Sequence, residues 1–130
     1  ENYLEKILDL TTGSQLHRFP LIDRKYLHLD MALGRIGDSG YLVFESAFEN
    51  GLASLEGSPV LEKEIIPIAT EDAERFACNG ITIGKTFITG KISGSLIDSI
   101  ERLGYRAITL ELSESHKADG GLKCLTLPLE

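Results

Sequence analysis

Apolar positions recur with a period of two over several short segments, which is typical of half-buried β-strands. The clearest case is 25–33, where every second position from 27 to 33 is apolar and predicts a strand with one buried face. A glycine-containing turn follows over 34–40, and a second apolar run over 41–44 predicts the return strand. We therefore expect a hairpin over 25–44.

Helical signals are shorter and lie between the strand signals. The apolar positions of 3–10 and the segment 46–55 predict two short helices, and 64–68 predicts a strand. Thr70 is followed by acidic residues, which suit the positive end of a helix dipole, so we expect Thr70 to be an N-cap. The first half of the chain thus has the order hairpin, helix, strand.

The second half repeats this order. Short strands are expected over 81–83 and 86–89. A helix beginning near Ser93 has an apolar stripe and stops at Gly104, because glycine commonly ends helices.

The C-terminal part is expected to hold two further strands. The first covers 105–112 and the second 123–129, with a loop over 113–121 between them. Alternating leucines mark the core face of the last strand, so Cys124 is expected on its opposite face. Together these elements predict one α/β domain that contains two units of similar order, about 25–68 and 80–127.

The chain has 130 residues and a formal net charge of -7. An acidic chain repels the phosphates of nucleic acids and of anionic membranes, so neither is an expected partner. The charge favours a cationic small molecule, although it also serves solubility. No apolar run reaches the roughly 20 residues of a transmembrane helix, and no signal-peptide pattern is present, so we expect a cytoplasmic protein.

Three polar residues carry the candidate chemistry. The two cysteines, Cys78 and Cys124, have no zinc-site spacing, and neither a disulfide nor a cofactor is expected. His28 and Asp30 project from the predicted strand 25–33 on its polar face, as Cys124 does from the last strand. A histidine can activate a thiol, and a carboxylate can hold a cationic substrate. The spacing alone also fits a buried cysteine, an ordinary strand histidine and a solvated aspartate.

Three segments together favour the chemical interpretation. The tail 113–127, SESHKADGGLKCLTL, resembles the C-terminal signature of the guanidino-group-modifying enzymes, in which a cysteine near the chain end is the nucleophile. Leu27–Asp30 resembles the family's His-x-Asp strand, and Ala77–Ile81 resembles its Ala-x-Asn segment. The family includes dimethylarginine dimethylaminohydrolases, arginine deiminases and arginine:glycine amidinotransferases. The resemblance extends over about 25–129.

This resemblance implies the pentein fold, a propeller of five ββαβ modules around a central pocket, of which about two to three would be present here. It implies that Cys124 attacks the guanidinium carbon and forms a covalent thiouronium intermediate. His28 would protonate the leaving amine and then activate water or an acceptor amine, and Asp30 would bind the guanidinium nitrogens. The substrate would be arginine or a related guanidino compound, processed by hydrolysis or by amidino transfer.

The remaining histidines and the second cysteine have weaker assignments. Cys78 occupies a position where the family has a variable small residue, so we expect it in the core. His116 would lie on the loop over the pocket, which leaves a substrate contact and a purely structural place both open. His17 is expected at the surface.

Complete chains of the family are much longer than this one, and residues 1–24 contain no counterpart of their N-terminal acidic groups. The chain begins with Glu1 rather than Met, so we expect 1–130 to be a single C-terminal fragment of an α/β propeller. Its expected partner is the missing N-terminal half. Without that half we expect no activity, and self-association through open sheet edges. The alternative function is a pentein-fold module that binds a ligand without catalysis.

Overall fold

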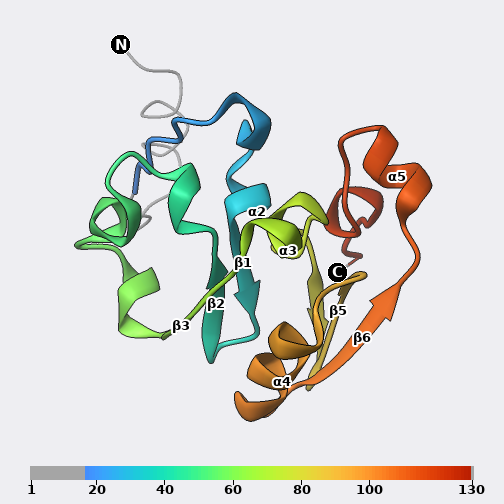
Figure 1. The fold of residues 1–130 in the computed structure, drawn as a ribbon. Coiled ribbons are helices and arrows are strands. Elements are labelled where there is room, and N and C mark those ends of the chain that lie inside the picture. The colour runs from blue at the N-terminus through green and yellow to red at the C-terminus, as the bar shows by residue number, and fades with distance from the viewer. Residues whose placement is uncertain (1–16, 130) are drawn as a thin grey trace.

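The computed structural model describes residues 17–129, and its six strands form two three-stranded sheets. The helix predicted over 3–10 lies outside the described residues. Figure 1 shows the sheets side by side, with β3 (Glu64–Pro67) at one outer side and β6 (Arg106–Leu110) at the other. The fold is therefore mixed α/β, with two small sheets rather than one large one.

The first sheet joins a hairpin to a parallel third strand. Strand β1 (Leu33–Ile36) pairs antiparallel with β2 (Gly40–Val43), and β2 pairs parallel with β3. The chain passes from β2 to β3 through three short 3-10 helices, Glu45–Ala47, Gly51–Leu55 and Pro59–Glu62.

The second sheet has the same topology. Strand β4 (Ile81–Ile83) pairs antiparallel with β5 (Thr86–Gly90), and β5 pairs parallel with β6. The crossover from β5 to β6 contains the helix α4 (Gly94–Arg102). The strands and the helix expected between 81 and 112 are thus confirmed.

Helix α4 begins at a doubly fixed N-cap. The Ser93 hydroxyl oxygen accepts a hydrogen bond from the backbone N–H of Leu96 at 3.3 Å. The backbone N–H and the hydroxyl of Ser93 in turn donate to the carboxylate of Asp72 at 2.7 and 2.6 Å. Asp72 lies in the short helix α3 (Thr70–Glu74) and is 3% exposed. These bonds satisfy a buried carboxylate and tie α3 to the start of α4.

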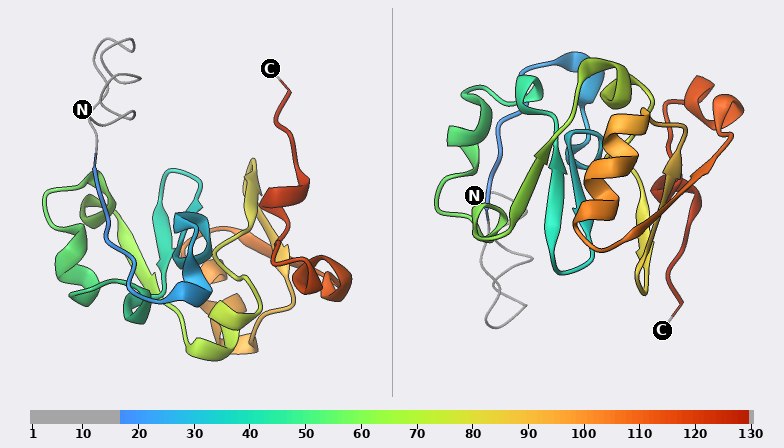
Figure 2. Two further views of the ribbon diagram at one scale, coloured as in Figure 1. Left: turned by 90° about the horizontal axis from the view of Figure 1, so that it is seen from above. Right: turned by 60° about the horizontal axis from the view of Figure 1, so that its bottom comes forward.

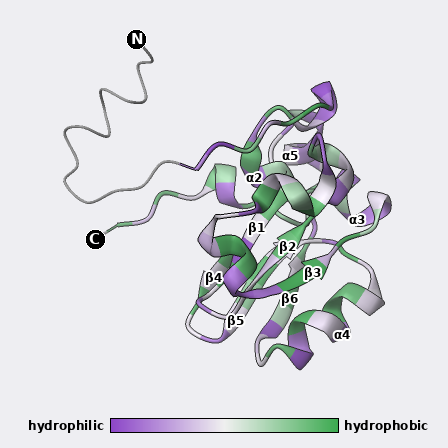
Figure 3. Ribbon diagram, turned by 90° about the vertical axis from the view of Figure 1, so that its left-hand side faces the viewer, coloured by the Kyte–Doolittle hydropathy of each residue, from purple (hydrophilic) through white to green (hydrophobic). Residues whose placement is uncertain are grey.

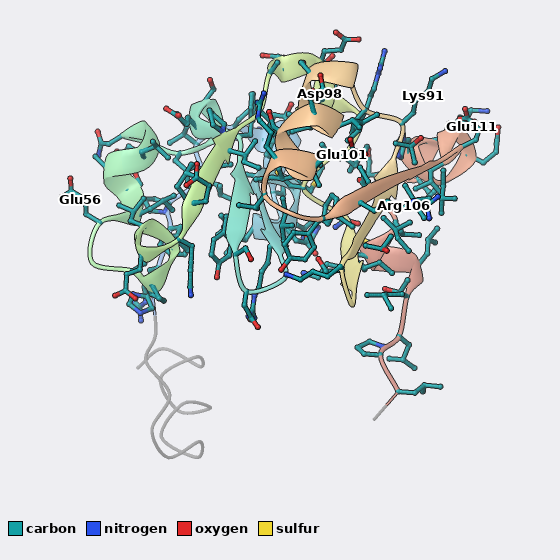
Figure 4. All side chains as sticks on the ribbon, turned by 90° about the horizontal axis from the view of Figure 1, so that it is seen from below. Glu56, Lys91, Asp98, Glu101, Arg106 and Glu111 are labelled. Atoms are coloured by element: carbon teal, nitrogen blue, oxygen red, sulfur yellow. The ribbon has the colours of Figure 1, made fainter. Side chains whose placement is uncertain are left out.

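The amphipathic character of α4 decides which side of it meets the sheet. Leu96 and Ile100 are buried, whereas Figure 4 shows the charged Asp98 and Glu101 on the outer side of the molecule. Colouring by hydropathy shows the same change between polar and apolar positions along the helix (Figure 3). One apolar stripe facing a sheet is sufficient to hold a helix of this length in place.

The two sheets are joined along β1 and β4, which lie next to each other. The backbone N–H of Gly37, in the turn between β1 and β2, donates to the Thr82 hydroxyl in β4 at 3.1 Å. The hydroxyls of Ser39 and Tyr105 share a second hydrogen bond of 3.1 Å. The buried apolar side chains form one cluster across both sheets, and the largest of them include Phe48, Phe87, Ile36, Leu42 and Leu55. No helix within residues 17–129 is long and apolar enough to cross a membrane.

The strand predicted over 25–33 is wrong. A 3-10 helix (Arg24–Tyr26) and the short helix α2 (Leu29–Ala32) fill this segment, and β1 starts only after them. The Asp23 carboxylate accepts a backbone hydrogen bond within the first of these turns, which favours the turn over an extended chain. Leu27 is 71% exposed, so the alternating leucines do not mark a buried face. The hairpin therefore comprises only β1 and β2.

The strand predicted over 123–129 is also wrong. Lys123–Leu125 forms a 3-10 helix, and the residues after it pair with no strand in the described part of the chain. The leucines expected in the core are exposed, by 64% at Leu125, 81% at Leu127 and 87% at Leu129. The physical reason is that the backbone N–H groups of Lys123 and Cys124, at the start of this tail, donate to Asn79 and not to a neighbouring strand.

Three smaller expectations need correction. The helix predicted over 46–55 is a pair of 3-10 helices instead. Helix α5 (Ser113–Lys117) occupies the first part of the predicted loop 113–121. Thr70 is the first residue of α3, and its N-cap is Ala69.

Replacing Gly34 by alanine should destabilise the chain. Gly34 in β1 packs against the backbone of Cys78, and a Cβ at position 34 would lie 2.7 Å from the Cα of Cys78. Because backbone cannot rotate away as a side chain can, we expect the free energy of unfolding to fall by about 1–3 kcal/mol in urea denaturation. Gly94→Ala is the matched control, since its Cβ would meet nothing within 4 Å. Equal losses in the two variants would contradict this close packing.

Candidate active site

Cys124 is positioned through its backbone rather than its side chain. Its N–H donates to the side-chain oxygen Oδ1 of Asn79 at 3.2 Å, and the N–H of Lys123 donates to the backbone oxygen of Asn79 at 3.0 Å. Asn79 itself is fully buried, while Cys124 is exposed. One buried residue therefore fixes the backbone at the candidate nucleophile and leaves its thiol accessible.

The glycine pair before Cys124 places this segment, and Gly121 allows the close approach to Asn79. A Cβ at Gly121 would lie 2.6 Å from Oδ1 of Asn79, so only glycine fits there without displacing the asparagine. The carbonyl oxygen of Gly120 accepts a hydrogen bond from the Ser115 hydroxyl in α5 at 2.7 Å. The glycine pair thus links α5 to the buried asparagine and brings the chain to Cys124.

Asp30 is joined to the same tail by an ion pair. Its carboxylate oxygen Oδ2 lies 3.4 Å from the ammonium Nζ of Lys123. The Asp30 side chain is 29% exposed, because α2 places it against the body of the molecule, whereas the Lys123 side chain is 54% exposed. The structure therefore connects the Asp30 carboxylate directly to the residue next to Cys124.

His28 is the predicted site residue with the least support from neighbours. It is exposed and extended, with φ -106° and ψ 135°, and its carbonyl oxygen accepts from the N–H of Met31 at 3.0 Å at the start of α2. Within residues 17–129 its imidazole makes no hydrogen bond or ion pair. His28 lies at the N-cap of α2 and Asp30 within that helix, and the common strand face that was expected for them does not exist. Among the described residues no hydrogen bond or ion pair joins His28 to Asp30 or to Cys124, whereas Asp30 is joined to the tail through Lys123.

The remaining cysteine and the other two histidines are packed against neighbouring residues. Cys78 is 1% exposed, as expected for a core residue, and burial raises the pKa of its thiol far above the ordinary value. His116 packs on Phe76 with ring centroids 4.8 Å apart, and burial lowers its pKa. His17 is partly buried and stacks near Phe19 instead of lying free at the surface. In the described part of the chain, no three acidic, cysteine or histidine side chains gather as metal ligands would.

A cavity of about 900 Å³ lies between the tail and β4. Lys123 and Leu127 border it from the tail, Ile83 from β4, and Arg35 and Asp38 from the first hairpin. Figure 2 shows that the tail leads away from the sheets beyond this point. The cavity gives the Lys123 side chain open space next to Cys124.

Several curated proteins are similar in sequence, although no protein-family profile matches the chain. It is 34% identical over 125 residues to the bifunctional arginine dihydrolase/ornithine cyclodeaminase AgrE of Nostoc, and 27% identical over 109 residues to the N(G),N(G)-dimethylarginine dimethylaminohydrolase of Mycobacterium tuberculosis. The matches cover 96% and 84% of this chain.

The structure is also similar to a solved enzyme domain. The N-terminal domain of ArgZ, an arginine dihydrolase from cyanobacteria, matches with a TM-score of 0.82 and 29% identity over 96% of this chain. The chain belongs to the guanidino-group-modifying enzymes. The resemblance to this superfamily that was expected from the sequence is thereby confirmed.

The chain is shorter than the superfamily members that it matches. It spans 17% of AgrE, 35% of the mycobacterial enzyme and 44% of the ArgZ domain. Structures of that domain include a cysteine-to-serine variant bound to substrate and another variant covalently bonded to a reaction intermediate.

Two residues of this site were not assigned a role from the sequence. Asn79 lies in the Ala77–Ile81 segment that pointed to the superfamily, but its bonds to the tail depend on contacts 45 residues apart. Its Nδ2 atom is buried and has no hydrogen-bond partner within residues 17–129. Lys123 lies in the tail that resembles the family signature, and no local signal in the sequence reveals its pairing with Asp30.

The two thiols should differ sharply in reactivity. We expect one thiol per chain to react with a neutral reagent such as iodoacetamide in native buffer, and two in denaturant, because burial and a raised pKa protect Cys78. The variant Cys124→Ser should lose the native reaction and keep the denatured one, as measured by mass spectrometry. A native reaction that survives in Cys124→Ser would contradict this assignment.

Removing the Asn79 side-chain acceptor should loosen the tail. In Asn79→Leu the Cys124 N–H has no partner, and we expect amide hydrogen exchange in residues 120–129 to accelerate by about tenfold, the equivalent of about 1.4 kcal/mol for one hydrogen bond. Asn50→Leu, at an exposed position, is the control and should exchange like the parent. Unchanged exchange in Asn79→Leu would show that the asparagine does not hold Cys124.

Proposed function

We propose that the chain is part of the catalytic domain of a guanidino-group hydrolase, with Cys124 as nucleophile and Asp30 as the binding group for the guanidinium. The observation that carries the proposal is the pairing described above: Asn79 fixes the backbone of an exposed cysteine, and the adjacent lysine reaches Asp30 at 3.4 Å. The Asp30 carboxylate thus contacts the residue next to the exposed Cys124 thiol. A carboxylate and a thiol arranged in this way suit a small cationic substrate.

The chemistry of a guanidinium explains why these groups are needed. The ion is planar and cationic, so a carboxylate can accept two parallel N–H bonds from it. Its carbon is a poor electrophile, and a thiolate is the strongest nucleophile that a protein side chain offers near neutral pH. In the proposed reaction, Sγ of Cys124 bonds to the guanidinium carbon, and the C–N bond to the leaving amine breaks. Water then attacks the thiouronium carbon, and the C–S bond breaks.

His28 is the proposed proton carrier. The departing amine must be protonated and the attacking water deprotonated, and an imidazole can do both in turn. His28 is exposed, and it precedes Asp30 by two residues at the start of α2, so the segment that binds the guanidinium also carries a base.

The relatives support hydrolysis on arginine or a similar compound over amidino transfer. AgrE and ArgZ are named as arginine dihydrolases and the mycobacterial relative as a dimethylaminohydrolase, so each uses water as the acceptor. The ArgZ structures with substrate in a cysteine variant, and with a covalent intermediate, support a cysteine nucleophile here by analogy.

We further propose that additional modules complete the site. The chain spans 44% of the ArgZ domain, and the exposed side chain of His28 leaves room for groups from outside the described residues. On this basis the 130-residue chain alone should show no turnover and should gain it when the rest of the domain is present.

Substitution of the two cysteines tests the nucleophile in the complete domain. Cys124→Ser should lower the rate of ammonia release from arginine by about 10³-fold or more, because a serine hydroxyl is not ionised near neutral pH. Cys78→Ala is the matched control and should keep the rate of the parent, since Cys78 lies in the core. Circular dichroism would establish that both variants are folded. Equal rates in the parent and Cys124→Ser would remove Cys124 from the mechanism, and arginine binding without any turnover would favour a binding module.

A further inference from the structure

Lys123 is the charged residue of the site that the proposed reaction does not use. Its ammonium lies 3.4 Å from Oδ2 of Asp30, and its side chain also borders the cavity of about 900 Å³. A carboxylate that is only 29% exposed is partly shielded from water, and a nearby cation stabilises it. In the chain without substrate, Lys123 supplies that cation.

We infer, on the basis of the proposed function, that Lys123 occupies the guanidinium position on Asp30 in the free enzyme and must leave when substrate binds. Lys123 is thus an internal competitor that sets the affinity for guanidino compounds. Both ions carry one positive charge, so they compete for the same carboxylate.

The exchange favours the substrate for a geometric reason. The Lys123–Asp30 pair joins one ammonium to one carboxylate oxygen, and a half-exposed ion pair of this kind is weak. A guanidinium presents two N–H groups in a fixed plane and can bond both carboxylate oxygens. The lysine therefore lowers the affinity without blocking the site.

The lysine can leave without moving the nucleophile. Its backbone N–H stays bonded to the carbonyl oxygen of Asn79 at 3.0 Å, so only the flexible side chain has to rotate. The side chain is 54% exposed and already borders open space, so its ammonium can become hydrated after it separates from Asp30. Cys124 keeps its own bond to Asn79 throughout.

The Lys123–Asp30 ion pair can also form again at the end of the proposed reaction. Hydrolysis converts a guanidinium and water into a neutral ureido group and ammonium, so the product no longer neutralises Asp30. Lys123 can then pair with the carboxylate again, which favours release of the product over its retention.

Arginine binding to the complete domain in the Cys124→Ser background tests this inference, because no turnover disturbs the calorimetry. Lys123→Met should bind arginine about two- to five-fold more tightly, the range expected when a half-exposed ion pair no longer competes. Lys123→Arg should bind it more weakly than the parent, because an arginine side chain would pair with Asp30 more strongly than lysine does. Lys63→Met, an exposed site with the same change of charge, should leave the affinity unchanged.

The outcomes separate this inference from the proposed function. Tighter binding with Met and weaker binding with Arg supports competition for Asp30. Equal affinities of the Lys and Arg forms would show plain charge repulsion and overturn the inference, and so would weaker binding in Lys123→Met. If no variant binds arginine or another guanidino compound, the proposed function fails and this inference fails with it.

Discussion

The arrangement of this molecule depends on three consecutive residues before β4, Ala77–Asn79. The carbonyl oxygen of Ala77 accepts a hydrogen bond from the Thr89 hydroxyl in β5 at 3.2 Å, and the backbone of Cys78 lies against Gly34 in β1. Asn79 binds the tail at Cys124. The second sheet, the first sheet and the tail therefore meet at adjacent positions of one buried segment, and the place of Cys124 relative to Asp30 follows from that meeting.

The turn that leads into this segment is held in an unfavourable conformation. Phe76 has a φ of 59°, in the left-handed region that side chains other than glycine rarely adopt. Its ring is buried and packs on His116 of α5 at 4.8 Å between ring centroids. Since such strain persists only where surrounding contacts determine it, the packing of α5 on Phe76 helps to hold the Ala77–Asn79 segment in place. The helix before the glycine pair and the asparagine after Phe76 thus support the tail from two sides.

The sequence predicted the second sheet better than the first because its signals are local. The Ser93 side chain caps α4 by accepting from the N–H of Leu96, three residues further along the chain. Gly84 has the positive φ that the tight β4–β5 turn requires. By contrast, the alternating leucines of 25–33 and 123–129 suggested strands, but turns at Asp23 and bonds to Asn79 decide those segments instead. The site residues came from resemblance to a family, whose motif names the reacting groups and not the residues that hold them. Asn79 and Lys123 act through contacts between distant segments, which periodicity cannot reveal.

Charge compensation at Asp30 connects the fold to the chemistry. The Asp30 carboxylate is only 29% exposed, so a nearby cation stabilises it, and the net charge of -7 favours cations around the chain. In the structure Lys123 supplies that cation. In the proposed function a guanidinium takes its place and bonds both carboxylate oxygens, so the lysine would lower the affinity for it. A strong permanent partner such as a buried arginine would compete with substrate more strongly for the carboxylate in that proposal. A weak, flexible lysine stabilises the carboxylate and can still give way to a guanidinium, which is a physical reason for a lysine at the position before the cysteine.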